Sequence, residues 1–533
     1  MIPANCKRLI EVDLPIKTVS EHARHEQNVK KGHLHSMHVW WATRPLTACR
    51  AVLLGTLVPD PVDPSCPENF KRRAWELLRP LSAKSEANGA NLRRSLLNFI
   101  GEFSAWENST DSSMVNIARE LIKASHSDGI PLVADPFAGI GSIPFEALRI
   151  GADSFASDLN PVATLLLKTA LEYVPTYGER LAKEVRRWGT RVKKRAMQEL
   201  HEFYPTEPDG SIPLAYIWAR TIRCEGPGCG AEVPLVGLLW LSQREKVALR
   251  YHGDKKARKV VFEIFKPKSE RDIQKSIVNR FTATCPVCNY TTPYPRVVEQ
   301  LKKKHGGTLD AKMIAVITVK ANGRRGYRLA TEKDFEVAKR AVQRLEELRQ
   351  KHAGSPPLVP EEPLPPQGSL GFRIQKYGME SWGDAFTSRQ VLALSTFVKA
   401  IRYAHEEILR KTGDQDFAKA VTTCLSFAVS GTLAPYQSSL SFYSSDHMRS
   451  IFMQGMAIPM RPDFAEANPL MPDLVGGFDY ALERVEQALK CQIVGSFKSG
   501  TVRQGPAAKI PLPDNSVPVI MTDRRPSPED ISL

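Results

Sequence analysis

The chain is organised around the stretch Val133-Ala-Asp-Pro-Phe-Ala-Gly-Ile-Gly-Ser-Ile-Pro-Phe-Glu-Ala-Leu148, which is followed by Ser154-Phe-Ala-Ser-Asp-Leu-Asn-Pro161. The apolar run over residues 131–134 predicts a short buried strand, and the glycines after it predict a tight turn that opens a helix. A second short strand follows and ends at Asp158. This order of elements predicts an α/β fold built on a strand–turn–helix–strand unit.

The same stretch predicts a ligand site. Two close glycines let the backbone approach a ligand, and the start of the helix offers free N–H groups. An acid that ends the second strand can accept hydrogen bonds from both hydroxyls of a ribose. The alternative is a strand–turn–helix that binds nothing. The expected ligand-binding residues are Asp135, Phe137, Ala138, Gly139, Gly141, Asp158 and Asn160.

Composition limits the class of protein and its partners. The 533 residues (59.4 kDa) have room for roughly two to four domains, and the formal net charge is +15. This charge favours a polyanionic partner, because each Lys or Arg placed on a phosphate releases counterions. Charge alone does not distinguish DNA, RNA or an acidic membrane surface, and a basic protein without a nucleic-acid role stays an alternative.

The sequence predicts a cytoplasmic protein that does not associate with membranes. It shows no long apolar stretch of the kind that spans a bilayer, and the N-terminus has no apolar secretory core. Nine cysteines is an odd number, and five of them have no close partner in the sequence. Reduced thiols in a cytosol fit this pattern better than a disulfide framework does.

A histidine- and tryptophan-rich segment precedes the first strongly apolar helix, which we expect over Leu46–Leu57. In the pattern H-x-W-W-A-x-R-P, Trp40, Trp41 and Arg44 could form a wall over an adenine or a carboxylate. The alternative is a pair of core tryptophans. The five nearby histidines match no standard spacing of metal ligands, which favours surface or packed side chains.

Two cysteine pairs predict a structural zinc site. The pairs are Cys224 with Cys229 and Cys285 with Cys288, each beside β-prone sequence. Four thiolates on two turns match tetrahedral zinc, and they leave no open position for a catalytic water. The region between the pairs, residues 241–280, is basic and alternates Lys or Arg with β-prone residues.

Several of these motifs together resemble the adenine-specific DNA methylases that contain a zinc ribbon. They are Leu9-Ile-Glu-Val-Asp-Leu-Pro15, the H-x-W-W-A-x-R-P segment, the D-P-F-x-G-x-G-S motif, the string YGM-x-x-WGD-x-FT-x-RQ that ends at Gln390, and DFAEANP before Leu470. The resemblance covers residues from about 5 to 523. It implies a Rossmann-like methyltransferase sheet with a large insert that holds the zinc ribbon and helices.

The resemblance also implies a division of the chain into functional parts. The expected parts are an N-terminal segment that closes the cofactor site (1–60), a helical layer (61–130), the S-adenosylmethionine-binding half of the methyltransferase domain (131–175), the zinc ribbon with its basic insertion (205–300), a mixed segment (301–353), a Pro-rich linker (354–368), a helical region for target recognition (369–500) and the start of the catalytic half (501–533). The implied cofactors are S-adenosylmethionine and structural Zn²⁺, and the implied partner is double-stranded DNA.

In the resembled enzymes, the segment upstream of the D-P-F-x-G-x-G-S motif helps to close the methionine end of the cofactor site. The resemblance implies this role for Trp40, Trp41 and Arg44 of this chain. Asp523 would be the catalytic residue, at the end of a strand that carries the motif D/N-P-P-Y/F. There the acid and a proline carbonyl accept the two N–H bonds of the exocyclic adenine amine, and the aromatic residue stacks on the flipped base. The implied reaction is methylation of adenine N6.

This chain departs from that motif, since it reads Thr522-Asp-Arg-Arg-Pro-Ser-Pro. Both prolines and the aromatic residue are replaced. We therefore expect a frameshift and a sheet that is incomplete at the C-terminus, with activity impaired unless a separately encoded C-terminal half or defence-system subunits supply the rest. Two alternatives are an RNA methyltransferase and a non-catalytic zinc-ribbon protein that binds nucleic acid.

Overall fold

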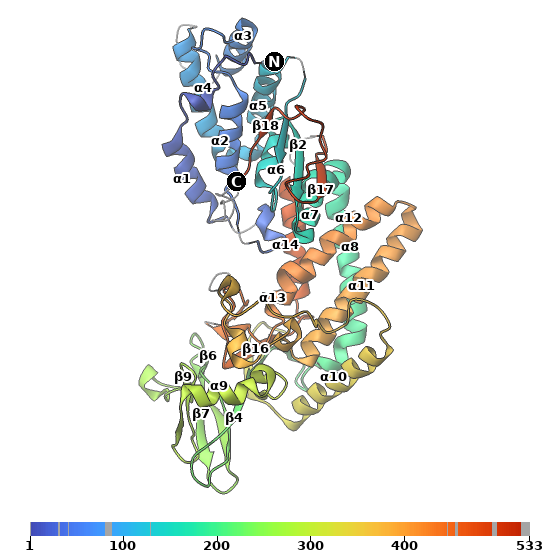
Figure 1. Ribbon diagram of the computed structural model, residues 1–533. Helices are drawn as coiled ribbons and strands as arrows, with labels where there is room; N and C mark the ends of the chain where they lie inside the picture. Colours follow the sequence, from blue (N-terminus) through green and yellow to red (C-terminus); the bar gives the residue numbers. More distant parts are fainter. Residues whose placement is uncertain are drawn as a thin grey trace. The chain divides into compact units, whose positions relative to one another are not determined.

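The computed structural model describes residues 2–29, 32–40, 42–79, 88–127, 129–444, 446–453, 457–492 and 498–523 (Figure 1). The protein is mixed α/β with several sheets, and the chain divides into two compact units. The first unit contains Met1–Arg186, Thr412–Cys424 and Arg484–Leu533. The second unit contains Arg187–Lys411 and Leu425–Glu483.

A parallel sheet forms the centre of the first unit. Its strands are β1 (Leu132–Asp135), β2 (Asp153–Asp158), β17 (Thr501–Gln504) and β18 (Val519–Ile520). They pair in the order β17-β2-β1-β18, and every pairing is parallel. The predicted strand over 131–134 corresponds to β1. The chain leaves this sheet after β2 and returns at β17, so the second unit is inserted between two strands of the sheet.

Helices connect and cover the sheet. Helix α6 (Ser142–Arg149) follows β1, as the glycine turn predicts, and α7 (Pro161–Lys168) follows β2 and continues into a π-helical turn (Thr169–Tyr173). Parallel neighbours require such crossover connections, because the chain must return to the edge at which it started.

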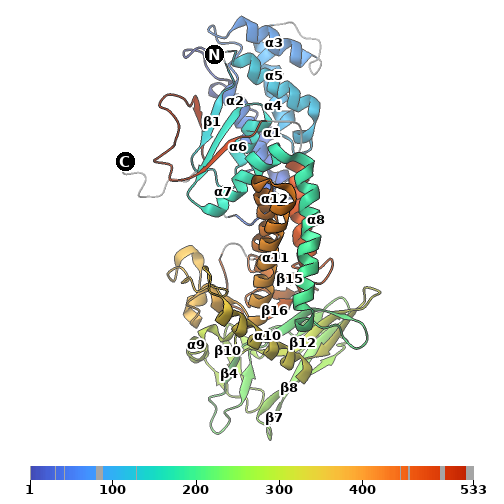
Figure 2. The same cartoon turned by 90° about the vertical axis from the view of Figure 1, so that its right-hand side faces the viewer.

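A layer of N-terminal helices packs beside this sheet (Figure 2). It consists of α1 (Ile16–Glu26), α2 (Leu46–Leu57), α3 (Glu68–Leu78), α4 (Gly89–Ser104) and α5 (Ser112–Ser125). The layer shares one apolar core with Val133 of β1 and Ile143 of α6. Helix α2 matches the helix predicted over Leu46–Leu57.

The second unit contains an antiparallel sheet in the order β13-β12-β3-β16. These strands are β3 (Ile212–Ala219), β12 (Lys312–Val319), β13 (Arg325–Leu329) and β16 (Asp463–Ala467). The expected helical region 369–500 therefore also supplies a strand to this sheet, and it contains the hairpin β14 (Phe442–Ser444) and β15 (His447–Arg449). Propensity alone did not predict β16, which is defined by its pairing with β3.

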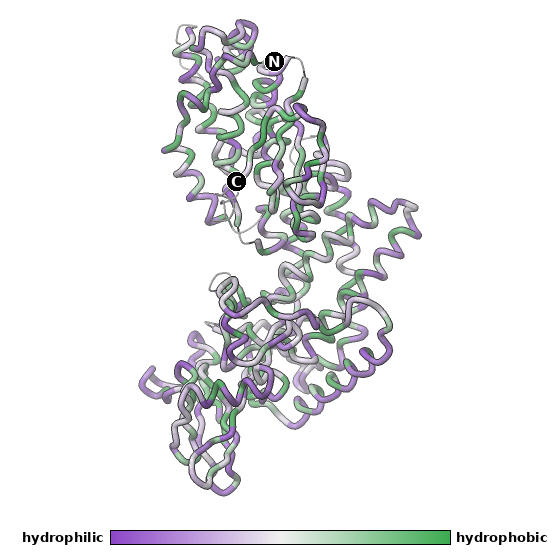
Figure 3. The backbone as a smooth tube through the Cα atoms, viewed as in Figure 1, coloured by the Kyte–Doolittle hydropathy of each residue, from purple (hydrophilic) through white to green (hydrophobic). Residues whose placement is uncertain are grey.

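The helices of the second unit follow their sequence patterns closely. Helix α10 (Glu332–Lys351) is hydrophilic over most of its length (Figure 3), and its buried apolar residues Val337, Ala341 and Leu345 recur at helical spacing. A capping box of the type T-x-x-Q begins α11 (Ser388–Thr412). Gln390 donates its backbone N–H to the Thr387 hydroxyl at 3.2 Å, and its side-chain oxygen accepts from Thr387 N at 2.9 Å.

The rest of the second unit is rich in short strands. A five-stranded sheet has the order β4-β5-β8-β7-β6, and a three-stranded sheet has the order β11-β10-β9. The basic, β-prone insertion forms the hairpin of β7 (Val247–Asp254) and β8 (Lys259–Phe265). The other strands are β4 (Thr221–Arg223), β5 (Glu232–Pro234), β6 (Trp240–Ser242), β9 (Val278–Asn279), β10 (Thr282–Thr284) and β11 (Thr291–Thr292). Helix α9 (Tyr294–Lys302) follows β11.

One helical run, Gln415–Tyr436, is long and apolar enough to cross a membrane by length and composition. It contains α12 (Gln415–Phe427) and the π-helical turn that follows it. Within its most apolar window, 72% is buried inside the protein. The expectation that no apolar stretch reaches this length is therefore wrong, although the run has the burial of a core helix.

Candidate functional site

A small cavity lies in the first unit where β1, β2 and β18 end. It has a volume of about 120 Å³. The lining residues are Trp40, Ala42, Arg44, Asp135, Phe137, Ala138, Gly139, Ile140, Ser142, Ile143, Asp158 and Asp523. The carboxyl ends of parallel strands meet at one edge of a sheet, which is where ligands bind in open α/β folds. Residues from three separate parts of the sequence are therefore brought to the expected edge.

The glycine turn is held by Asp158. The two carboxylate oxygens of Asp158 accept hydrogen bonds from Gly139 N at 2.9 Å and from Asn160 N at 2.8 Å. A carboxylate has about four lone-pair sites, so acceptor capacity remains for a ligand hydroxyl. Gly139 has a φ of 54°, and a Cβ there would lie 3.0 Å from Nε1 of Trp40. The turn thus requires glycine for its conformation and for the close approach of Trp40.

Asp135 is the most buried carboxylate of the cavity, with an exposed fraction of 2%. Burial raises its pKa to about 7, and the negative charges of Asp523 and Asp158 add to the increase. Hydrogen bonds from Phe137 N and from the Thr522 side chain oppose it. The cavity therefore contains three carboxylates, one of which titrates near neutral pH.

A single cationic side chain, Arg44, is found among the described residues that line this cavity. Its Nε forms an ion pair with the Asp523 carboxylate, and its Nη2 donates to the backbone oxygen of Asp523 at 3.4 Å. The Ser142 hydroxyl donates to the backbone oxygen of Arg44 at 3.1 Å. The backbone of the H-x-W-W-A-x-R-P segment is thereby fixed to the first residue of α6.

Two of the predicted ligand-binding residues that the structure describes, Asn160 and Gly141, do not line the cavity. The Asn160 side chain caps α7, where it accepts from Val162 N and Ala163 N. Gly141 begins α6 with a φ of 92°, and a Cβ there would lie 2.8 Å from Cδ2 of Leu167. Trp41 lies outside the described residues. The two former residues shape the turn and the helices around the cavity.

Sequence reasoning missed a buried ionic network beside the site. Arg50 on α2 and Arg149 on α6 both pair with Glu146, at 2.7 Å and 3.1 Å, and all three side chains are at most 4% exposed. Arg50 also donates to the backbone oxygens of Phe103 and Ala105. Glu146 belongs to the D-P-F-x-G-x-G-S-x-x-x-E-A motif, so the sequence did draw attention to it. No motif contains its partner Arg50, so the ion pair could not be predicted.

A second buried acid fixes the segment that carries Arg44. Glu26 accepts hydrogen bonds from Leu46 N and Thr47 N at the start of α2 and contacts His33 Nε2 at 2.7 Å. Burial works to raise the pKa of Glu26, but these hydrogen bonds outweigh it and lower the pKa to about 2. An anion is favourable at a helix N-terminus. Glu26 therefore holds the residues on either side of Arg44 in place.

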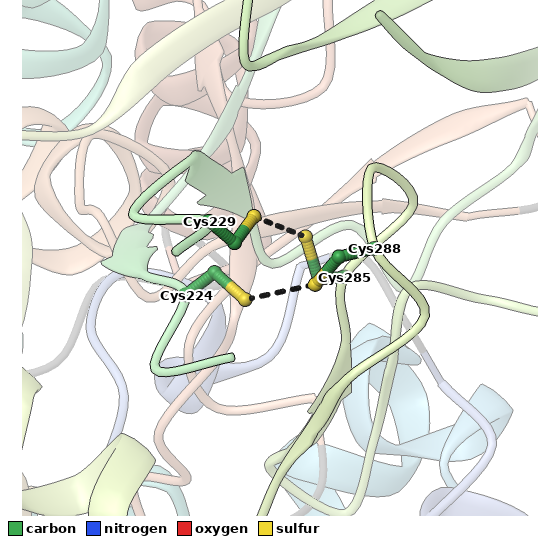
Figure 4. Close-up of side chains that lie close together, drawn as sticks. All are labelled: Cys224, Cys229, Cys285 and Cys288. Carbon is green, nitrogen blue, oxygen red and sulfur yellow. Dashed lines mark hydrogen bonds between the residues drawn. The ribbon is translucent and has the colours of Figure 1, made fainter. Parts of the chain in front are cut away.

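The four predicted metal ligands come together in the second unit (Figure 4). Cys224 Sγ lies 3.5 Å from Cys288 Sγ, and Cys229 Sγ lies 3.9 Å from Cys285 Sγ. All four sulfur atoms lie within 4.8 Å of one another. Tetrahedral zinc with Zn–S bonds of about 2.3 Å requires S···S separations of about 3.8 Å. The cluster could therefore hold a metal ion such as zinc.

Two hairpin turns create this geometry. The first cysteine pair occupies the turn between β4 and β5, and the second occupies the turn between β10 and β11. Gly226 donates its N–H to Cys224 Sγ at 3.4 Å. A Cβ on Gly226 would lie 2.8 Å from Tyr290 Cβ and 3.0 Å from Cys288 Sγ. Glycine is therefore required where the two turns meet.

Comparison with known proteins adds one match. A family described as a protein of unknown function (DUF1156) matches residues 13–77. No curated protein and no solved structure matches the chain. The matched residues include α1, Arg44, α2 and most of α3, so the match covers the segment that contributes Trp40 and Arg44 to the cavity.

Proposed function

We propose that the protein is an S-adenosylmethionine-dependent methyltransferase that acts on adenine N6 in double-stranded DNA. The observation that carries this proposal is the cavity at the ends of β1, β2 and β18, with three carboxylates and one guanidinium in its lining. An acidic lining favours a cationic ligand over a phosphate-bearing nucleotide. S-adenosylmethionine is cationic at its sulfonium and ammonium groups, and it supplies the electrophilic methyl group.

The strand order supports the same proposal. All four strands are parallel, in the order β17-β2-β1-β18. In a doubly wound sheet, β1, β2 and β17 would form one half, and β18 would be the first strand of the other half, across the switch point from β1. The ligand site of such a sheet lies outside the carboxyl ends of the strands. Asp158 ends β2, where its carboxylate would accept hydrogen bonds from ribose hydroxyls, and Trp40 lies beside the turn at Gly139.

Asp523 provides the acceptors for the target amine. Its carboxylate can accept one N–H bond of an exocyclic amine. Its own backbone carbonyl, in place of the proline carbonyl of the resembled enzymes, can accept the other, which directs the nitrogen lone pair toward the methyl donor. Arg524 and Arg525 follow Asp523 where the resembled enzymes have two prolines. Pro526 stands where the motif has its aromatic residue, so no aromatic ring is present there to stack on a flipped base, and we expect methyl transfer by this chain alone to be slow.

The net charge of +15 supports a nucleic-acid substrate, and the four-cysteine cluster supports a structural zinc ion in the second unit. The reduced cysteines and the buried apolar run fit a cytoplasmic enzyme.

Two aspartates on one strand allow a matched test of cofactor binding. Asp158 and Asp153 lie at opposite ends of β2, and only Asp158 lines the cavity. We expect Asp158→Asn to weaken S-adenosylmethionine binding at least about tenfold, since a ribose hydroxyl would lose a charged acceptor (about 1.5–3 kcal/mol). Asp153→Asn should leave it unchanged. Isothermal titration calorimetry provides the measurement.

Transfer is then assayed with radiolabelled S-adenosylmethionine on unmethylated double-stranded DNA and on structured RNA. Cleavage of the product by a restriction enzyme that requires N6-methyladenine would identify the DNA product. Preferential labelling of RNA would identify an RNA methyltransferase instead. Complete absence of cofactor binding would leave a non-catalytic nucleic-acid-binding protein, and rapid turnover would contradict the expected impairment.

A further inference from the structure

One ion pair engages both acceptor groups of Asp523. Arg44 Nε contacts the carboxylate, and Arg44 Nη2 donates to the backbone oxygen of the same residue. The proposed reaction requires these two oxygens for the N–H bonds of the target amine. A guanidinium and the exocyclic amine of adenine are chemically similar here, because each presents N–H donors on a planar, conjugated nitrogen. Arg44 and the target amine therefore compete for one site.

The exposure of this pair distinguishes it from a permanent structural contact. The side chains of Arg44 and Asp523 are 39% and 35% exposed, whereas those of Arg50 and Glu146 are 1% and 0% exposed. A solvated ion pair shifts an equilibrium by no more than about fivefold. A ligand that binds moderately well can displace Arg44 from Asp523, but it cannot separate Arg50 from Glu146.

The backbone at Arg44 is fixed while its side chain can leave. Ser142 holds the Arg44 carbonyl, and Pro45 directly precedes α2. With Arg44 on Asp523, the cavity of about 120 Å³ is smaller than the roughly 300 Å³ at which ligand pockets begin. Rotation of the Arg44 side chain toward solvent would enlarge the cavity and release both oxygens of Asp523 without moving the segment.

We propose that Arg44 is an autoinhibitory latch that occupies the amine-acceptor site on Asp523 and is displaced when a ligand amine enters. This inference rests on the proposed function, since it assigns Asp523 to the target amine. It changes the expected role of Arg44, which the sequence placed at the methionine end of the cofactor.

Two cofactor analogues test the latch without any methyl transfer. S-adenosylhomocysteine is an uncharged thioether at the reacting position, whereas sinefungin carries an amine there. Both analogues carry the α-ammonium and the adenine amine, so the amine at the reacting position is the one N–H donor group by which sinefungin adds a competitor for Arg44. Removal of the latch should therefore strengthen sinefungin binding more than S-adenosylhomocysteine binding.

Calorimetry measures both dissociation constants for the full chain and its variants. With Arg44→Ala, sinefungin should bind about two- to fivefold more tightly, while S-adenosylhomocysteine should change by less than about twofold. Arg44→Lys retains the charge but cannot fork to both oxygens, so its effect should be intermediate. Lys17→Ala, an exposed cation on α1, should change neither constant.

The double variant Arg44→Ala/Asp523→Asn separates the latch from a general charge effect. If Arg44 acts through Asp523, Arg44→Ala should have little further effect in the Asp523→Asn background. A gain that persists there, or an unchanged ratio of the two constants, overturns the latch. Failure of every variant, and of the wild type, to bind either analogue would refute the proposed function instead. Should Arg44→Ala not fold, Arg44→Lys supplies the same comparison.

Discussion

At the scale of single residues, Asp135 makes the first unit sensitive to pH. Its pKa is about 7 in the folded protein because of burial, against an ordinary value of 3.8. Between about pH 4 and pH 7 the folded protein retains a proton that the unfolded chain has released. The free energy of unfolding therefore falls as the pH rises through this window and is constant above it. The largest possible effect is on the order of 4 kcal/mol.

We expect Asp135→Asn to remove this slope and to stabilise the protein at pH 8. Urea unfolding at pH 5, 6, 7 and 8 measures the effect, with Asp153→Asn as the control on a neighbouring strand. A cationic ligand should also favour ionised Asp135, so binding should weaken below pH 7 and release a proton. A slope that survives in Asp135→Asn would assign the titration to another group.

Gly226 is the residue on which the shape of the cysteine cluster depends most directly. A Cβ at this position would contact both Tyr290 and the Cys288 sulfur. We expect Gly226→Ala to reduce zinc affinity about tenfold, as changes next to a ligand commonly do. Competition with a chromophoric chelator measures the affinity. Gly237→Ala is the matched control, because the nearest atom to its Cβ lies 3.7 Å away; equal loss in both variants would contradict the argument.

At the scale of elements, α2 and α6 are joined by the buried network of Arg50, Glu146 and Arg149. Loss of Arg50 would leave the buried Glu146 carboxylate with one cation in place of two and would take the guanidinium donor from the Phe103 and Ala105 carbonyls, a change on the order of 3–5 kcal/mol. We expect Arg50→Met to lower the free energy of unfolding by about this amount, as measured by urea denaturation.

A surface pair in the same helical layer provides the control. Arg73 on α3 is 45% exposed and pairs with Glu76 and Glu120. Arg73→Met should cost about 1 kcal/mol or less. Similar losses for Arg50→Met and Arg73→Met would show that the α2–α6 network contributes no more than solvated charges do.

Local patterns predicted elements well where the residues that define an element lie close together in the sequence. The Thr387–Gln390 capping box, helix α2 and the turn at Gly139 all follow from short-range chemistry. Pairings between distant segments were not predictable in this way. Strand β16 was not foreseen, and the pairing of Arg44 with Asp523 depends on two segments that share no pattern. Motifs therefore identified most of the residues that line the cavity, but they did not predict that Arg44 would pair with Asp523 there.

At the scale of the whole molecule, each of the two units contains an apolar core of its own. The core of the first unit joins α2, α3, α4 and α5 to β1. A core within the second unit includes Cys224, Cys229 and Cys285 together with Ile222 and Val233. Three of the four cysteines are thus part of the packing of the second unit, whereas the acidic cavity is built entirely from the first unit.

This separation predicts that metal removal affects one unit only. Binding energy at a structural zinc site is folding energy, so chelation should destabilise the hairpins that carry the cysteines. We expect faster amide hydrogen exchange over residues 221–292 after treatment with a chelator, with little change over α2, α6 and β1. S-adenosylmethionine should still bind the chelated protein with an affinity within about twofold of the untreated protein, because the cysteines lie outside the unit that forms the cavity. Loss of cofactor binding on chelation, restored by added Zn²⁺, would show instead that the metal cluster supports the cavity.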